Sequence, residues 1–182
     1  MRQSDKSLQS YDTLAKSFHW IMAFIIIYAT IAGYVMLMMS GRPMVLGVLH
    51  TLNVSGATVA AVLLVFRWIW SFFRKTPELP NTIPKLHQDI AKFAHAVVYL
   101  VMFIVFVSGF LMLKHDIQFF WLFTIKQPIS NVAVNEFFFI VHRISCAVLA
   151  VLIMLHVAAA MKHHFKLKNT VLKSMIFNKS EI

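Results

Sequence analysis

The sequence of this 182-residue chain is short of several residue types that commonly reveal a function. It has one cysteine, Cys146, which excludes an internal disulfide. It has only seven acidic residues, and Asp89, Asp116 and Glu136 stand at the ends of apolar stretches. Its five glycines form none of the glycine-rich loops that bind phosphate. These absences direct attention to the apolar stretches themselves.

The chain is too apolar for a soluble domain of this length. Hydrophobic residues make up 59% of it, charged residues 13%, and the mean hydropathy is +0.73. Four apolar windows, 18–39, 46–73, 90–113 and 136–161, each reach the ~20 residues that a helix needs to cross a bilayer. Lipid leaves backbone groups without partners, so the windows are predicted to be helices. We expect an all-α, transmembrane four-helix bundle that forms one domain over residues 1–182.

The positive charges predict the orientation of this bundle. The net charge is +10, and 13 of the 17 lysines and arginines lie in the two tails and the second connection or its approaches. By the positive-inside rule, both termini are cytoplasmic. The four remaining cations face the other side; they are Arg42, Lys114, Lys126 and Arg143.

Two connections have distinctive sequences. The stretch TPELPNTIP, residues 76–84, is typical of a proline-punctuated loop between the second and third windows. The third connection contains FFWLF, residues 119–123, which we expect at the membrane interface on the outer side.

Five of the nine histidines fall within or at the mouths of the apolar windows: His19, His50, His95, His142 and His156. Any one of them is explained equally well by a hydrogen bond to a neighbouring helix. Their joint placement favours a cofactor. His142 and His156 are fourteen residues apart, close to four whole helical turns, and so share one helix face about 21 Å apart along the axis.

Depth in the membrane pairs these histidines. In the predicted orientation His19 and His156 lie near the inner side, and His50 and His142 near the outer side. Two layers of two facing imidazoles form the arrangement expected for two haems, each iron held from both sides.

Glycines fit the same interpretation, because a porphyrin between helices needs close backbone. Gly33 lies fourteen residues after His19, Gly109 lies fourteen after His95, and Gly56 lies six after His50. For any single glycine, ordinary small-residue helix packing is the alternative.

The chain resembles the prokaryotic cytochrome b561 family of four-helix dihaem membrane proteins. The matching stretches are SFHW, LHTLNVSG, FAHAVVYL, VHRISC and LHVAAAMKHHFKLKNTVLKSM, which together run over nearly the whole chain. The resemblance implies a bacterial inner-membrane protein with two haem b groups and an exchange of electrons with quinone. It implies that the iron ligands are His19, His50, His142 and His156. The single cysteine also excludes the C-x-x-C-H attachment of a c-type haem.

Further residues are candidates for contacts around the haems. Arg67 and Arg143 are candidate partners of the propionates, with lipid phosphate as the alternative. His95 matches a further family histidine and is assigned to a propionate or a quinone. A quinone site on the inner side would draw on His95, Tyr99, Lys92 and Asp89. On the outer side, the four cations would attract an anionic one-electron donor such as superoxide, which some relatives are thought to use.

Two alternative functions remain open. The chain would have no reaction of its own if it were the electron-transfer subunit of a larger dehydrogenase. It would bind zinc or copper through its histidines if it were a transition-metal transporter. The absence of acidic residues inside the windows and the two-layer pairing of histidines both argue against transport. Nucleic-acid binding is not needed to explain the net charge, which topology and anionic lipid explain.

Overall fold

Four long helices dominate the computed structural model, which describes residues 10–39, 41–74, 84–168 and 170–177. The helices are α1 (Thr13–Met38), α2 (Pro43–Phe73), α3 (Lys85–Leu111) and α4 (Val132–Met161). Each is long and apolar enough to cross a membrane. The prediction of four membrane-spanning helices is therefore confirmed, and their exposed apolar faces imply contact with lipid.

The helices begin three to five residues before the predicted apolar windows, because polar residues and prolines start them. The side chain of Asp12 accepts a hydrogen bond from Ala15 N at 2.8 Å and caps α1. Asn131 caps α4 in the same way, and Pro43 opens α2. Apolar windows omit such first turns, so the predicted starts were too late.

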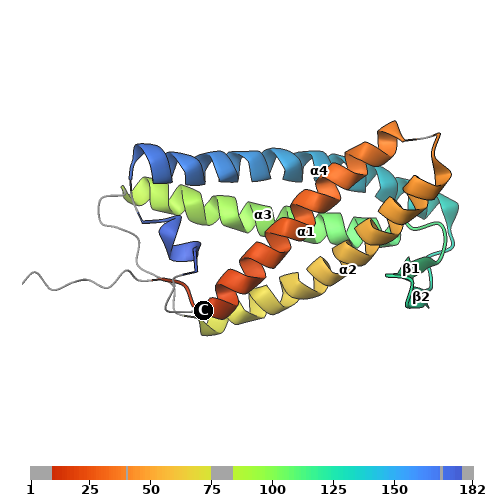
Figure 1. The fold of residues 1–182 in the computed structure, drawn as a ribbon, viewed down its shortest axis with the longest axis horizontal. Coiled ribbons are helices and arrows are strands. Elements are labelled where there is room, and N and C mark those ends of the chain that lie inside the picture. Colours follow the sequence, from red (N-terminus) through yellow and green to blue (C-terminus); the bar gives the residue numbers. More distant parts are fainter. Residues whose placement is uncertain (1–9, 40, 75–83, 169, 178–182) are drawn as a thin grey trace, which may run out of the picture.

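The helices form two hairpins, as Figure 1 shows. In one, α1 packs along α2, and in the other, α3 packs along α4. The hairpins cross obliquely, and α2 touches α3 over a shorter stretch. All four helices contribute to one buried apolar core, which consists of Met22, Ile26, Leu64, Val101, Met102, Val105 and Leu149. Leu149 lies midway in sequence between His142 and His156, so this core separates the two histidine layers.

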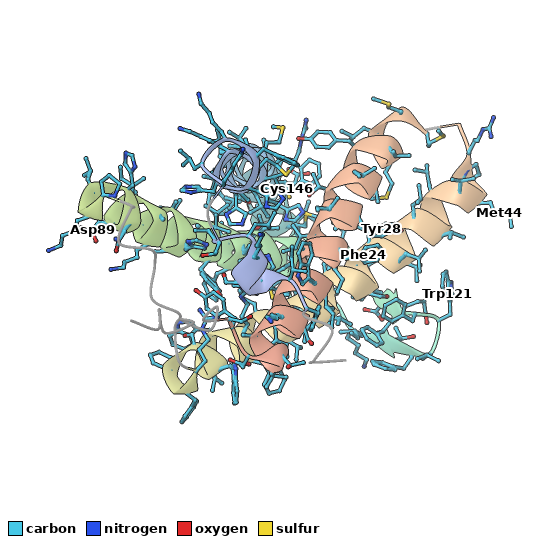
Figure 2. The ribbon with its side chains drawn as sticks, turned by 60° about the vertical axis from the view of Figure 1, so that its left-hand side comes forward. Phe24, Tyr28, Met44, Asp89, Trp121 and Cys146 are labelled. Carbon is cyan, nitrogen blue, oxygen red and sulfur yellow. The ribbon has the colours of Figure 1, made fainter. Side chains whose placement is uncertain are left out.

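The third connection departs from the all-α prediction. Residues Ile117–Phe119 (β1) and Phe123–Ile125 (β2) form a two-stranded antiparallel hairpin beside α2. Its turn exposes apolar residues of the predicted interfacial run, including Trp121, which is 57% exposed (Figure 2). The hairpin is held by Ser55 of α2, whose hydroxyl accepts a hydrogen bond from Phe120 N at 2.8 Å and donates one to Gln118 O at 3.3 Å.

Both ends of the described chain lie at the same end of the bundle. After α4 come a π-helix, Lys162–Lys166 (η1), and a 3₁₀ turn, Lys173–Met175 (η2). Tyr11 N donates a hydrogen bond to Ser174 O at 3.1 Å, so the segment before α1 contacts the segment after α4. This agrees with four membrane crossings. Most of the proline-rich stretch 76–84 and several predicted inner cations (Arg2, Lys6, Lys75 and Lys179) lie outside the described residues.

Candidate haem sites

The inner histidine layer is assembled from three helices. The imidazole rings of His19 on α1 and His156 on α4 have centres 6.4 Å apart and are tilted by 57°. His95 on α3 makes an edge contact with His156. The centres of these two rings are 5.3 Å apart, and the angle between the ring planes is 82°. The sequence-based pairing of His19 and His156 thus brings together two rings that are close in space.

The spacing of the first pair fits a shared metal ion. A metal–imidazole bond is about 2 Å long, so two imidazoles on opposite sides of one ion have ring centres about 6 Å apart. The 6.4 Å between His19 and His156 matches this value. The 5.3 Å edge contact of His95 is shorter than it and is an ordinary packing contact between rings. His95 Nδ1 donates to Ala91 O at 2.7 Å within its own helix.

Positive charge adjoins the inner layer. Arg67 on α2 lies within electrostatic range of both His19 and His156. Its Nε donates a hydrogen bond to the hydroxyl of Tyr99 at 2.6 Å, and its guanidinium lies 5.8 Å from the centre of that ring. Arg74, two turns beyond Arg67, also lies within electrostatic range of His19. A cofactor that carries carboxylates would find its charge compensated here.

The outer layer is less completely assembled. His142 Nδ1 lies 3.0 Å from Val105 O and 3.3 Å from the hydroxyl of Ser108. A carbonyl only accepts hydrogen bonds, so Nδ1 carries the proton and Nε2 is left as the basic nitrogen. Nε2 lies 3.4 Å from the thiol of Cys146. A carbonyl on the distal ring nitrogen is the usual support of a metal-binding histidine, so His142 is suited to bind iron through Nε2.

His50 is the other predicted outer residue. Its side chain is exposed and lines two neighbouring cavities of about 440 and 230 Å³, which it shares with Asp116 and Ile117 at the base of the β-hairpin. Across the described residues, no ring contact or hydrogen bond joins His50 to His142. The structure therefore shows a cavity beside His50 and a hydrogen-bonded imidazole at His142, but the two imidazoles do not face each other.

The three predicted glycines have different surroundings. A β-carbon added at Gly109 would lie 2.9 Å from Cε1 of His142, so this glycine makes room for the imidazole itself. One at Gly56 would meet Ile25 at 3.5 Å, an ordinary packing distance between α2 and α1. One at Gly33 would have no neighbour within 4 Å. Gly33 thus borders open space, as do Gly41 and Gly47.

Two of the four predicted outer cations have partners within the protein. Lys114 forms an ion pair with Glu136 at 3.5 Å, and the guanidinium of Arg143 lies 5.7 Å from the centre of the Phe139 ring. Lys92 pairs with Asp89, 3.7 Å away. Asp89 lies near the start of α3 (Figure 2), on the side that the sequence predicts to be the inner one. The pairing of Lys114 weakens the expected attraction for an anionic donor.

Sequence reasoning missed several residues around the histidines. Ser108 and the carbonyl of Val105 contact His142, and Cys146 approaches the other nitrogen of that ring. The spacing of Cys146, one turn after His142, indicated proximity but not contact. The indole of Trp20 packs edge-on against His19, with 5.5 Å between ring centres. In the described part of the chain, no three His, Cys, Asp or Glu side chains form a metal-binding cluster.

Four membrane-spanning helices that bring His19, His95 and His156 together at one end of the bundle, and place His142 against α3, define a class of membrane protein suited to hold haem between its helices. The chain matches the family model of prokaryotic cytochrome b561 over residues 10–178 and belongs to that family. Membership implies that it binds haem b and takes part in electron transfer as a multi-pass membrane protein. No curated protein matches the chain significantly.

Proposed function

We propose that this protein is an electron-transfer cytochrome of the bacterial inner membrane that holds two b-type haems and exchanges electrons with a quinone. In this proposal both termini are cytoplasmic, as the distribution of lysine and arginine favours. The observation that supports it most directly is the 6.4 Å separation of the His19 and His156 rings, which come from the first and last helices. Two imidazoles that bind one iron from opposite sides have about this spacing.

His19 and His156 would hold the inner haem, and His50 and His142 the outer one. Haem b held by these histidines would supply reversible one-electron transfer. Hydrogen bonding of Nδ1 to Val105 O keeps His142 in the tautomer whose Nε2 is unprotonated, and iron would take the place of the Cys146 thiol as its partner. Arg67 would compensate the propionates of the inner haem, and Arg143 those of the outer haem.

The apolar core between the layers keeps water and ions out of the middle of the bundle. Its seven side chains come from all four helices, so the two layers are separated by packed hydrocarbon. An electron can cross such a layer between haems, but a proton needs polar groups. Proton exchange is therefore expected at the two ends of the bundle.

The inner end offers groups for a quinone. Tyr99 accepts a hydrogen bond from Arg67, so its own O–H proton remains available for a quinone carbonyl. His95 donates through Nδ1 to Ala91 O, so its Nε2 remains available to take or give a proton. Both lie on α3 one turn apart and therefore share a face. Family membership and these free polar groups support the quinone site.

The proposal is tested by the optical spectrum of the detergent-purified protein, reduced minus oxidised, with haem and metals quantified per chain. Two b-type haems per chain are expected. One haem per chain would reject the two-layer assignment, and an absence of haem with bound zinc or copper would favour a metal transporter. Copurification of a dehydrogenase from the native membrane would instead favour the role of a subunit.

A further inference from the structure

The segment after α4 returns to the start of α1. Residues 170–177, which we name the C-terminal strap, contain the 3₁₀ turn Lys173–Met175. Tyr11 N and the hydroxyl of Ser10 both donate hydrogen bonds to Ser174 O, each at 3.1 Å. The ammonium of Lys16, which is fully buried, lies 5.8 Å from the centre of the Phe177 ring. The strap is therefore fastened to the first turns of α1 at several points.

The strongest of these contacts involves the residue next to His19. Trp20 Nε1 donates a hydrogen bond to Met175 O at 2.8 Å, across 155 positions of sequence. The same indole packs edge-on against the His19 imidazole, with 5.5 Å between ring centres and an interplanar angle of 78°. The hydrogen bond fixes the indole, and the fixed indole limits the rotation of the imidazole.

His19 lies in the second turn of α1, six residues after Thr13, so its position depends on how the first turn is held. The first turn of a helix lacks internal partners for its N–H groups and tends to fray. Here Asp12 caps α1 and also accepts a hydrogen bond from Trp70 Nε1 of α2 at 3.1 Å. The strap adds a second anchor on the side of α1 that carries Trp20.

We propose that Trp20, held by the C-terminal strap, is a positioning residue that sets the orientation of His19 toward the inner haem iron. This inference rests on the proposed function, because it requires a haem at His19. The orientation of an axial imidazole affects the electronic state and the reduction potential of its iron. The strap would thus adjust the haem that exchanges electrons with the quinone.

The test compares four full-length proteins and one truncated protein by redox titration and by low-temperature EPR. Trp20→Phe keeps an aromatic ring beside His19 but removes the indole donor. Trp121→Phe is the matched control, because Trp121 lies on the β-hairpin at the opposite end of the bundle. The truncated protein ends at residue 169 and lacks the strap. His142→Ala should lose the outer haem, so the EPR signal and the potential that remain in this variant belong to the inner haem.

We expect Trp20→Phe and the truncation to change the oxidised-to-reduced equilibrium of the inner haem about threefold to tenfold, where tenfold corresponds to 59 mV for one electron. The EPR signal of the inner haem should change with it, because that signal depends on the angle between the two imidazole planes. The outer haem and Trp121→Phe should keep the values of the unmodified protein.

Several outcomes would overturn the inference while leaving the proposed function intact. Two haems with unchanged potentials and EPR signals in Trp20→Phe would show that Trp20 does not position His19. Equal shifts of both haems, or an equal shift in Trp121→Phe, would show a general effect on the bundle. If the truncated protein fails to fold, the result for Trp20→Phe alone decides whether Trp20 positions His19. Absence of haem from the unmodified protein would instead reject the proposed function.

Discussion

The imidazole of His142 lies so close to Gly109 that a β-carbon at that position would approach the ring at 2.9 Å. The two residues come from α4 and α3, which pack against each other along their length. The ring is also hydrogen-bonded to Val105 O, one turn before Gly109, so it has little freedom to move aside. The glycine and the carbonyl together determine where the imidazole can lie.

Gly109→Ala is therefore expected to disturb the outer haem specifically. The added methyl group must displace His142, at a cost of about 1–3 kcal/mol for overpacking. We expect loss or weakening of one haem, measured as haem per chain and by redox titration. Gly41→Ala is the matched control, because a β-carbon there has no neighbour within 4 Å. Full haem content with unchanged potentials in Gly109→Ala would contradict the assignment of His142 to iron.

The sequence allowed the prediction of the helices and of the faces they present. Apolar windows located the four spans, and the interval of fourteen residues correctly predicted that His142 and His156 share a helix face. The rings of His19 and His156, which the depth argument paired, lie 6.4 Å apart, whereas no contact within the described residues joins His50 to His142, the other pair. These predictions follow from length and periodicity, which are local properties of the chain.

The contacts between distant segments could not be predicted in this way. Periodicity gives the face of a helix but not the neighbour on that face, so Val105 O beside His142 was unforeseen. The β-hairpin was unforeseen for a second reason. Phe120 and Trp121 have φ values of 44° and 60°, which aromatic residues rarely adopt. The hydrogen bond from Phe120 N to Ser55, 65 positions away, supports that conformation.

The three inner histidines can be separated by haem content. His19→Ala and His156→Ala should each remove one haem, because iron would lose one of its two imidazoles. His95→Ala should keep both haems, since its 5.3 Å edge contact with His156 is a packing contact, and should slow electron exchange with a quinone. The measurements are haem per chain and the rate of haem reduction by a quinol. Loss of a haem in His95→Ala would show that His95 is a ligand.

Gly33→Ala tests whether a cofactor fills the open space beside α1. No atom of the protein lies within 4 Å of a β-carbon at this position. The substitution should leave the free energy of unfolding of haem-free protein unchanged or raise it by up to about 1 kcal/mol, since alanine favours a helix. In the presence of haem it should lower haem content. Unimpaired haem binding in Gly33→Ala would show that the porphyrin does not approach this face.

Ser55→Ala tests the attachment of the β-hairpin to α2. Ser55 is fully buried, and its hydroxyl both accepts from Phe120 N and donates to Gln118 O. Removal of the hydroxyl leaves a partly buried N–H and a partly buried carbonyl without this partner, which costs about 1 kcal/mol, the low end of the range for buried groups. We expect a lower temperature of unfolding and faster proteolysis within residues 117–125.

A matched control separates the hairpin from the helix. Ser145 is also buried, but its hydroxyl donates only to carbonyls of its own helix, Val141 O and His142 O. Those carbonyls already accept hydrogen bonds within α4, so Ser145→Ala should have a smaller effect and should leave the hairpin resistant to protease. Because Gln118 lines the cavity beside His50, release of the hairpin should also open that cavity to water and change the outer haem more than the inner one. Equal effects of the two serine substitutions on hairpin cleavage would show that Ser55 does not hold the hairpin in place.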